Sequence, residues 1–186
     1  MKPIIIFLFL SVCSISIHGQ DKNNYVYFNK LIELGGTEYV IATIENVGKM
    51  FTVKGKYLLF INTSNGQSKQ VDFSSDASIH HVEQIRIDSL QINKVIVAGR
   101  TVNLDNSKNI DWGDPTQIII LSVDGQEKVQ LTEDKFFAAT WIINRQTGRI
   151  IITGHYDTND NGKYDKTDKS EILLYDLKTL KLISKI

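Results

Sequence analysis

The hydrophobic positions along this chain fall into short runs, most of them rich in valine, isoleucine and aromatic residues. Runs of this kind, bounded by turn residues, are typical of β-strands. The dipeptides Asn65-Gly66, Asp124-Gly125 and Thr147-Gly148 mark turns between neighbouring runs. The pattern therefore predicts an all-β protein whose successive strands pair antiparallel.

The runs also repeat along the chain. Residues 94–99 (KVIVAG) align with residues 149–154 (RIIITG), and residues 117–123 align with residues 171–177. The repeat is roughly fifty-five residues long, and residues 57–67 match it more loosely. Each repeat offers four strands. We expect them at 25–34, 38–45, 57–62 and 69–73, at 79–87, 95–101, 118–123 and 128–131, and at 136–144, 150–156, 172–177 and 181–186, within repeats of about 22–73, 76–131 and 133–186.

An acidic loop at residues 157–168 has the spacing of a calcium loop. Calcium takes about six to eight oxygen ligands, and a twelve-residue loop supplies them from positions 1, 3, 5, 7, 9 and 12. Gly162 stands at position 6, where the chain must turn sharply. The expected ligands are the side chains of Asp157, Asn159, Asn161, Asp165 and Asp168 and the carbonyl group of Lys163.

Two alternatives accompany this metal site. Asp168 is shorter than the usual glutamate at position 12, which allows Mg²⁺ to compete or water to fill a ligand position. The loop also has a plain interpretation, in which Asp, Asn and Gly serve only to turn the chain. Oxygen atoms at so many ligand positions favour the metal.

The preceding repeat carries a related loop. The residues opposite the expected ligands are Asn103, Asp105, Ser107, Asp111 and Asp114. Asn103 is a neutral first ligand, and Lys108 replaces the turn glycine with a positive charge. We expect this second loop to be a weakened or lost metal site.

The flanks of the calcium loop allow two structures. Residues 172–182 place Leu173, Leu177 and Leu180 on one face of a helix, as in the exit helix of an EF-hand. The matching segment of the preceding repeat holds Asp124-Gly125, a hairpin signal that a helix disfavours. We therefore expect the loop to join two strands.

Four antiparallel strands per repeat are the pattern of a β-propeller blade. The chain resembles the blade repeats of WD-type and TolB-like bacterial propellers, and residues 157–165 resemble the metal loops of FG-GAP propeller repeats and dockerin modules. Residues 166–170 extend that loop, and no Trp-Asp dipeptide marks the blades. The resemblance implies three four-stranded blade-like sheets, a half or partial propeller.

Three blades are fewer than the roughly four to eight that close a propeller ring. We expect a homodimer that completes a six-bladed ring, an open array of three sheets, or a shortened relative of a larger propeller. Exposed blade edges would favour pairing with another chain.

The N-terminus has the pattern of a secretory signal. A positive start is followed by an apolar run at 4–12 and by small and polar residues up to Gly19. The run is too short to span a bilayer. Cleavage after Gly19 would leave one domain, residues 20–186, in the periplasm or outside the cell, with no transmembrane segment.

Cys13 offers a second possibility for the same segment. Residues 10–13 resemble a bacterial lipobox, in which Cys13 would carry a lipid anchor, although Val12 departs from the small residue preferred there. Cys13 is the only cysteine, so cleavage after Gly19 would leave a chain without thiols or disulfides.

The remaining composition narrows the function. Lys and Arg number 21 and so do Asp and Glu, so the chain has no electrostatic attraction for nucleic acid or anionic membrane. The sequence lacks a Gly-x-Ser-x-Gly elbow, a phosphate-binding glycine loop and a His-Glu-x-x-His motif. His80 and His81 are adjacent and would point to opposite faces of a strand. Packing is the simpler role for His155, beside the calcium loop, and for Trp112, whose alternative is exposed recognition.

Three functions follow from these patterns. The favoured one is an exported, non-catalytic calcium-binding protein that serves as a binding or scaffold module. The second is a ligand-binding or carbohydrate-active propeller completed by dimerisation, and the third is a calcium sensor. A loop without a helix pair has nothing to open as sensor EF-hands do, which favours the first. The partner, a protein or a carbohydrate, is not specified by the sequence.

Overall fold

The computed structural model describes residues 28, 30–43 and 57–186, and these contain twelve strands. The strands are β1 (Lys30–Glu33), β2 (Tyr39–Thr43), β3 (Tyr57–Asn62), β4 (Ser68–Asp72), β5 (Ser78–Ile87), β6 (Ile92–Arg100), β7 (Gln117–Ser122), β8 (Lys128–Gln130), β9 (Phe136–Asn144), β10 (Arg149–Tyr156), β11 (Lys169–Asp176) and β12 (Leu182–Lys185). The expected signal segment 1–19, Cys13 and parts of the first two expected strands lie outside the described residues.

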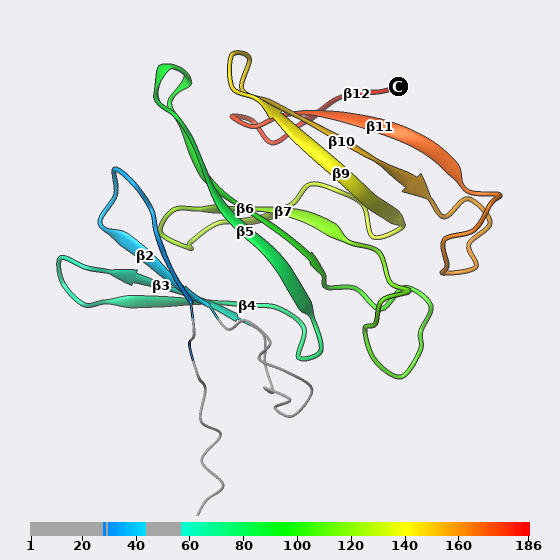
Figure 1. The fold of residues 1–186 in the computed structure, drawn as a ribbon, viewed down its shortest axis with the longest axis horizontal. Coiled ribbons are helices and arrows are strands. Elements are labelled where there is room, and N and C mark those ends of the chain that lie inside the picture. The colour runs from blue at the N-terminus through cyan, green and yellow to red at the C-terminus, as the bar shows by residue number, and fades with distance from the viewer. Residues whose placement is uncertain (1–27, 29, 44–56) are drawn as a thin grey trace, which may run out of the picture.

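The strands form three four-stranded antiparallel sheets in chain order. Sheet A contains β1 to β4, sheet B contains β5 to β8, and sheet C contains β9 to β12. Within each sheet, strands that follow one another in the chain pair side by side, and sheet B lies between the other two (Figure 1). The prediction of an all-β fold with three four-stranded blade-like repeats is confirmed.

The repeat is visible in the hairpin after the third strand of each sheet. The backbone N–H groups of Asn62, Ser122 and Asp176 each donate to the carbonyl oxygen of the residue five positions later in the chain, at 2.8, 3.0 and 3.0 Å. These residues therefore occupy equivalent positions in the three sheets. Counting back from them, Phe60, Ile120 and Leu174 are equivalent as well.

Sheet B is buried on both faces. In β6, Val95 and Val97 belong to the core shared with sheet A, whereas Ile96 and Ala98 belong to the core shared with sheet C. All four side chains are fully buried. Successive side chains of a strand point to opposite faces, so a strand buried on both sides needs a continuous apolar run. This explains the unbroken apolar segments of β6 and β7.

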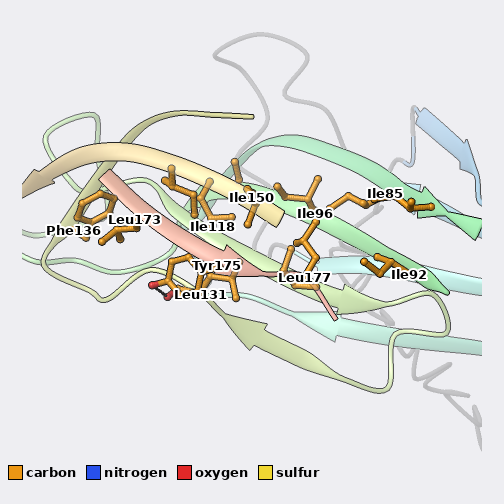
Figure 2. Close-up of a cluster of buried hydrophobic side chains, with 14 residues drawn as sticks. Ile85, Ile92, Ile96, Ile118, Leu131, Phe136, Ile150, Leu173, Tyr175 and Leu177 are labelled. Atoms are coloured by element: carbon orange, nitrogen blue, oxygen red, sulfur yellow. Dashed lines mark hydrogen bonds between the residues drawn. The ribbon is translucent and has the colours of Figure 1, made fainter. Parts of the chain in front are cut away.

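The core between sheets B and C is the larger of the two clusters (Figure 2). Isoleucines of sheet B, including Ile96 and Ile118, face Ile150, Leu173 and Tyr175 of sheet C. Each fully buried aliphatic side chain contributes about 1.5–3 kcal/mol relative to an exposed one. The Tyr175 hydroxyl donates to the Leu131 carbonyl oxygen at 2.6 Å, and burial raises the pKa of Tyr175 to about 12.

The glycine that ends each aligned apolar run stands beside a β-bulge. The pairing of β5 with β6 shifts between Ile79 and His81, opposite Gly99, and the pairing of β9 with β10 shifts beside Gly154. A Cβ atom on Gly99 would lie 2.8 Å from the Ser78 carbonyl oxygen, so the backbones approach too closely for a side chain. The two bulges stand just before the two candidate loops.

The segment that could have formed an EF-hand exit helix forms β11 and the hairpin to β12 instead. The loop at 157–168 therefore joins two antiparallel strands, as predicted. The helical structure of the described residues is limited to the short 3₁₀ turn Asp88–Leu90. Across that part of the chain, no helix has the length and apolar character needed to cross a membrane.

Candidate metal loop and adjacent cleft

Asp157 anchors the candidate loop at the end of β10. Its side chain is buried, and its backbone N–H donates to the Lys135 carbonyl oxygen at 3.0 Å. One carboxylate oxygen accepts the N–H of Asn161 at 3.1 Å, and the other accepts the N–H of Gly162 at 2.8 Å. The first expected ligand thus folds the front half of the loop around itself.

Short-range hydrogen bonds continue this turn. The side-chain oxygen of Asn159 accepts the Asn161 N–H at 3.1 Å, and that of Asn161 accepts the Lys163 N–H at 2.8 Å. Asn side chains commonly stabilise turns in this way. Each amide oxygen has a second lone pair, so these bonds leave it able to act as a ligand.

Asp165 is where the side chains of the loop converge. One of its carboxylate oxygens accepts the amide groups of Asn159 and Asn161, at 3.0 and 2.7 Å. The other accepts the Thr167 hydroxyl and N–H, at 2.6 and 2.7 Å. The bonds from Thr167 are the main cause of a pKa for Asp165 well below its ordinary value. Four donors therefore stabilise the ionised carboxylate.

Asp168 closes the loop. Its two carboxylate oxygens accept the N–H of Thr158 at 3.2 Å and the N–H of Asp165 at 2.8 Å. This side chain joins the beginning of the loop to its end, a role that spacing alone did not reveal. Lys163, whose carbonyl group is the expected ligand at position 7, has an exposed side chain.

The donor chemistry of the loop fits a hard cation, because every expected ligand atom is an oxygen. The structure connects Asp157, Asn159, Asn161 and Asp165 through hydrogen bonds. The carboxylates themselves are not gathered: within the described ranges, no three His, Cys, Asp or Glu side chains are placed to hold a metal ion. Metal binding stays a prediction.

The second loop, between β6 and β7, closes in the same way. Asp114 is buried, and its carboxylate oxygens accept the N–H groups of Leu104 and Asp111, both at 2.8 Å. Leu104 and Asp111 correspond to Thr158 and Asp165 of the first loop. The residue at position 12 therefore acts as the same clasp in both loops.

The front halves of the two loops differ. Asp105 accepts the Ser107 N–H at 2.9 Å, and the Asn103 amide donates to the Ser107 carbonyl oxygen at 2.8 Å. The amide oxygen of Asn103 is buried and accepts no hydrogen bond. Lys108 is exposed and turns its charge to solvent rather than into the loop. At the first ligand position, this loop therefore has a neutral amide oxygen that accepts no hydrogen bond. The other loop has a carboxylate that accepts two hydrogen bonds there.

The two loops touch. Gly162 has a φ of +73°, and a Cβ atom at this position would lie 2.7 Å from the Cα atom of Asp105 and 3.0 Å from the Leu104 carbonyl oxygen. Gly162 is therefore needed for the turn and for the contact with the neighbouring loop. The turn was predicted from the sequence, whereas the contact arises from the packing of sheets B and C.

A cleft of about 570 Å³ lies beside this contact. Trp112 and Tyr164 contribute one aromatic side chain from each loop, and Phe137 of β9 and His155 of β10 also line the cleft. The ring centroids of His155 and Tyr164 are 4.6 Å apart, so His155 packs against an aromatic ring. Trp112 is 86% exposed and does not pack over a blade edge.

Among the other histidines that the structure describes, His81 packs against the second tryptophan. The His81 and Trp141 ring centroids lie 5.3 Å apart, and Trp141 packs against the core between sheets B and C. His80 occupies the bulge in β5 and is exposed, and partial desolvation, followed by the positive charge of Arg100, lowers its pKa.

Few known proteins are similar to this chain. No protein-family model matches the chain, and no curated protein sequence matches it. Among solved structures, the acylaminoacyl peptidase of Pyrococcus horikoshii is similar, with a TM-score of 0.45 and 12% sequence identity. The match covers 88% of this chain and 25% of that protein, so the chain spans a quarter of its length.

Proposed function

We propose that this chain is an exported, non-catalytic binding or scaffold module whose 157–168 loop is held in one shape by calcium, with Mg²⁺ as a weaker competitor. The hydrogen-bond pattern of Asp157 carries the proposal. Its two oxygens fold the chain around the first ligand position, and the next two odd positions present further oxygens to the same turn. Asp157, Asn159, Asn161, Asp165, Asp168 and the Lys163 carbonyl group would hold the ion.

Calcium would supply positive charge that offsets the repulsion between the loop carboxylates. The position of the loop gives this stiffening a purpose, because the loop forms one wall of the cleft and contacts the 103–114 loop through Gly162. In the proposed module, calcium fixes a binding surface rather than driving a conformational switch. Export to the periplasm or cell exterior would supply calcium at concentrations suited to a modest site.

Thermal unfolding of the mature chain in calcium, magnesium and chelator tests this function. Extracellular calcium modules have dissociation constants of about 10⁻⁴ to 10⁻³ M, so about 10 mM calcium would add about 1.4 to 2.7 kcal/mol. For a domain of this size we expect the melting temperature to rise by about 3 to 10 °C. An equal melting temperature in calcium and chelator would contradict the proposal.

The variant Asp157→Asn distinguishes the contribution of the metal to stability from that of the turn hydrogen bonds. Asp157 accepts two backbone N–H groups, so part of the loss should appear in chelator as well, and the additional loss in calcium measures the metal. Asp176→Asn is the matched control. Asp176 accepts backbone N–H groups of Lys178 and Thr179 in a hairpin outside the loop, so its loss should be the same in both solutions.

The outer face of sheet C supports a second candidate, a ligand-binding or carbohydrate-active propeller completed by dimerisation. Ile151 and Ile172 are each 37% exposed on this face, whereas the equivalent Ile96 and Ile118 of sheet B are fully buried against sheet C. Sheet C therefore presents, uncovered, the surface that sheet B uses to bind its neighbour. Ile142 and Ile186 are also exposed, at 67 and 74%.

The opposite end of the array has the complementary surface. Val40, Leu59 and Ile61 of sheet A are half-buried and correspond to Val95, Ile119 and Leu121, the residues of sheet B that pack on sheet A. A second copy could therefore repeat the existing sheet-to-sheet interface by placing its sheet A on sheet C. This second candidate uses apolar faces in addition to the strand edges expected from the sequence.

Sedimentation equilibrium tests the dimer. We expect a dimer at about 100 μM, well above the micromolar dissociation constants typical of weak dimers, and Ile172→Lys should shift it to monomer by placing a charge on the apolar face. Gln126→Lys adds the same charge at an exposed hairpin position of sheet B and serves as the control. A monomeric wild-type chain at this concentration would exclude the dimer.

A further inference from the structure

The cleft between the two loops has two walls from different repeats. Trp112 and Asp111 come from the 103–114 loop, and Lys163 and Tyr164 come from the 157–168 loop. Phe137 of β9 and His155 of β10 lie at the ends of the strands below. The loop contact at Gly162 holds the two walls beside each other, so the cleft does not depend on a single flexible loop.

Aromatic side chains dominate the exposed apolar surface of the cleft. Trp112 is 86% exposed and Tyr164 is 58% exposed, although large aromatic side chains usually gain most by burial. Tyr164 is supported from behind, with its ring centroid 4.6 Å from that of His155 and 6.3 Å from that of Phe137. Exposed aromatic rings in a concave site mark a surface that a ligand covers.

The polar groups of the cleft include donors and acceptors in balance. Arg100 and Lys163 bring positive charges, and Asp105 and Asp111 bring negative ones. Asp114 also lines the cleft, but it is buried and both of its carboxylate oxygens accept N–H groups of its own loop. The Nε atom of Arg100 donates to the Asp114 carbonyl oxygen at 3.1 Å, which fixes the guanidinium group on the wall. A strongly anionic or cationic ligand would meet an unfavourable partner among these four groups, so the balance favours a neutral ligand that both donates and accepts hydrogen bonds.

We propose that the cleft binds a neutral glycan, with sugar rings stacked on Trp112 and Tyr164. A pyranose ring has an apolar C–H face that covers an aromatic ring and hydroxyl groups that reach donors and acceptors around it, which matches the cleft. A volume of about 570 Å³ lies within the range of about 300–1,000 Å³ typical of small-ligand sites. This role rests on the binding-module function proposed above and names its ligand, but it does not require calcium.

Tryptophan fluorescence tests the proposal directly, because the chain has only two tryptophans. In Trp141→Phe the emission reports Trp112 alone. We expect at least one of four neutral oligosaccharides, the hexamers of β-1,4-glucose, β-1,4-xylose, β-1,4-mannose and β-1,3-glucose, to shift this emission to shorter wavelength at concentrations up to about 10 mM, above the millimolar range of weak binding. No shift with all four would overturn the proposal.

Calorimetry of the wild-type chain with the same oligosaccharides guards against a folding defect in the reporter variant. Trp112→Ala and Tyr164→Ala should each weaken binding about ten-fold, equivalent to about 1.4 kcal/mol, and Trp112→Phe should restore part of it because stacking needs only a ring face. Val129→Ala, an exposed position on β8 away from the cleft, is the control and should bind as wild type. Equal affinity in Trp112→Ala would overturn the proposed stacking.

Two further experiments distinguish glycan binding from the binding of a protein partner and from the proposed calcium role. A casein-derived peptide mixture that shifts the Trp112 emission, with no response to the oligosaccharides, would overturn the glycan in favour of a protein partner. All titrations are run in calcium and in chelator. Glycan binding without a calcium-dependent melting shift would support the cleft and reject the calcium role, and a calcium shift without glycan binding would do the reverse.

Discussion

The loops at 103–114 and 157–168 close in the same way but differ at positions 1 and 6. In both, the carboxylate at position 12 accepts the N–H groups of positions 2 and 9, and the residue at position 4, Asn106 or Asp160, has a positive φ. Position 1 is Asn103 in one and Asp157 in the other, and position 6 is Lys108 or Gly162. The clasp is thus common to both repeats, whereas the oxygen-rich turn belongs to one.

This difference separates the structural role of the motif from its proposed metal role. A loop with a neutral first ligand and no glycine at position 6 still closes between two strands, so closure needs the carboxylate at position 12 rather than a full ligand set. The additional oxygens of the 157–168 loop accept hydrogen bonds within the turn, and the proposed calcium would give them a second role. Variants can test the clasp, the turn and the charge separately.

Removing the clasp should have the largest effect. Asp114→Ala would leave the partly buried N–H groups of Leu104 and Asp111 without their acceptor. A lost partner costs about 1–3 kcal/mol for a fully buried group and less where water reaches it. We expect a total loss of about 2–4 kcal/mol in urea unfolding. Asp105→Ala, in the same loop but with one backbone bond to an exposed turn, should cost less. Equal losses would show that Asp114 has no special role.

The loop-to-loop contact can be measured with two glycines. Gly162 and Gly66 have nearly the same φ, +73° and +74°, so alanine at either position adopts a left-handed conformation at about 1 kcal/mol. A Cβ atom at Gly66 would meet nothing within 4 Å, whereas one at Gly162 would collide with Asp105. We expect Gly162→Ala to lose about 1–2 kcal/mol more than Gly66→Ala. Similar losses would mean that the loops separate without cost.

The three sheets were predictable because hydrophobic pattern and turn residues report local structure. The apolar runs of β6 and β10 and the Asp124-Gly125 turn placed the strands, and the repeat excluded a helix after the 157–168 loop. The buried state of both faces of β6 is also consistent with its unbroken apolar run. These features depend on neighbours close in the sequence.

The candidate site was less predictable because its decisive contacts join distant segments. Spacing identified Asp157 and Asp168 as candidate oxygen ligands, but it did not show that Asp168 joins the two ends of the loop. The approach of Gly162 to Asp105 and the exposed position of Trp112 beside Tyr164 arise from the way sheet C packs on sheet B. A single sequence has no local signal for such a meeting of two loops.

The smallest expected difference between the loops is in how much their stability depends on acidic pH. Hydrogen bonds from Thr167, and then from Asn159 and Asn161, hold the pKa of Asp165 below its ordinary value in the folded chain. A depressed folded pKa stabilises the fold above the ordinary pKa of Asp, and this contribution is lost as pH falls through the folded pKa. Asp165→Asn should therefore lower stability at pH 6 and change it less at pH 3, measured by urea unfolding in chelator.

Asp105→Asn provides the comparison in the other loop, because the pKa of Asp105 is also lowered, mainly by the N–H and hydroxyl groups of Ser107. Asp105 has fewer partners than Asp165, so its variant should show a smaller difference between the two pH values. Both carboxylates are exposed to solvent, which screens their interactions and makes these the weakest effects. A larger pH dependence for Asp105→Asn would mean that the charge stabilising the loops lies in the 103–114 loop, and the assignment of the stronger carboxylate centre to the 157–168 loop would then be wrong.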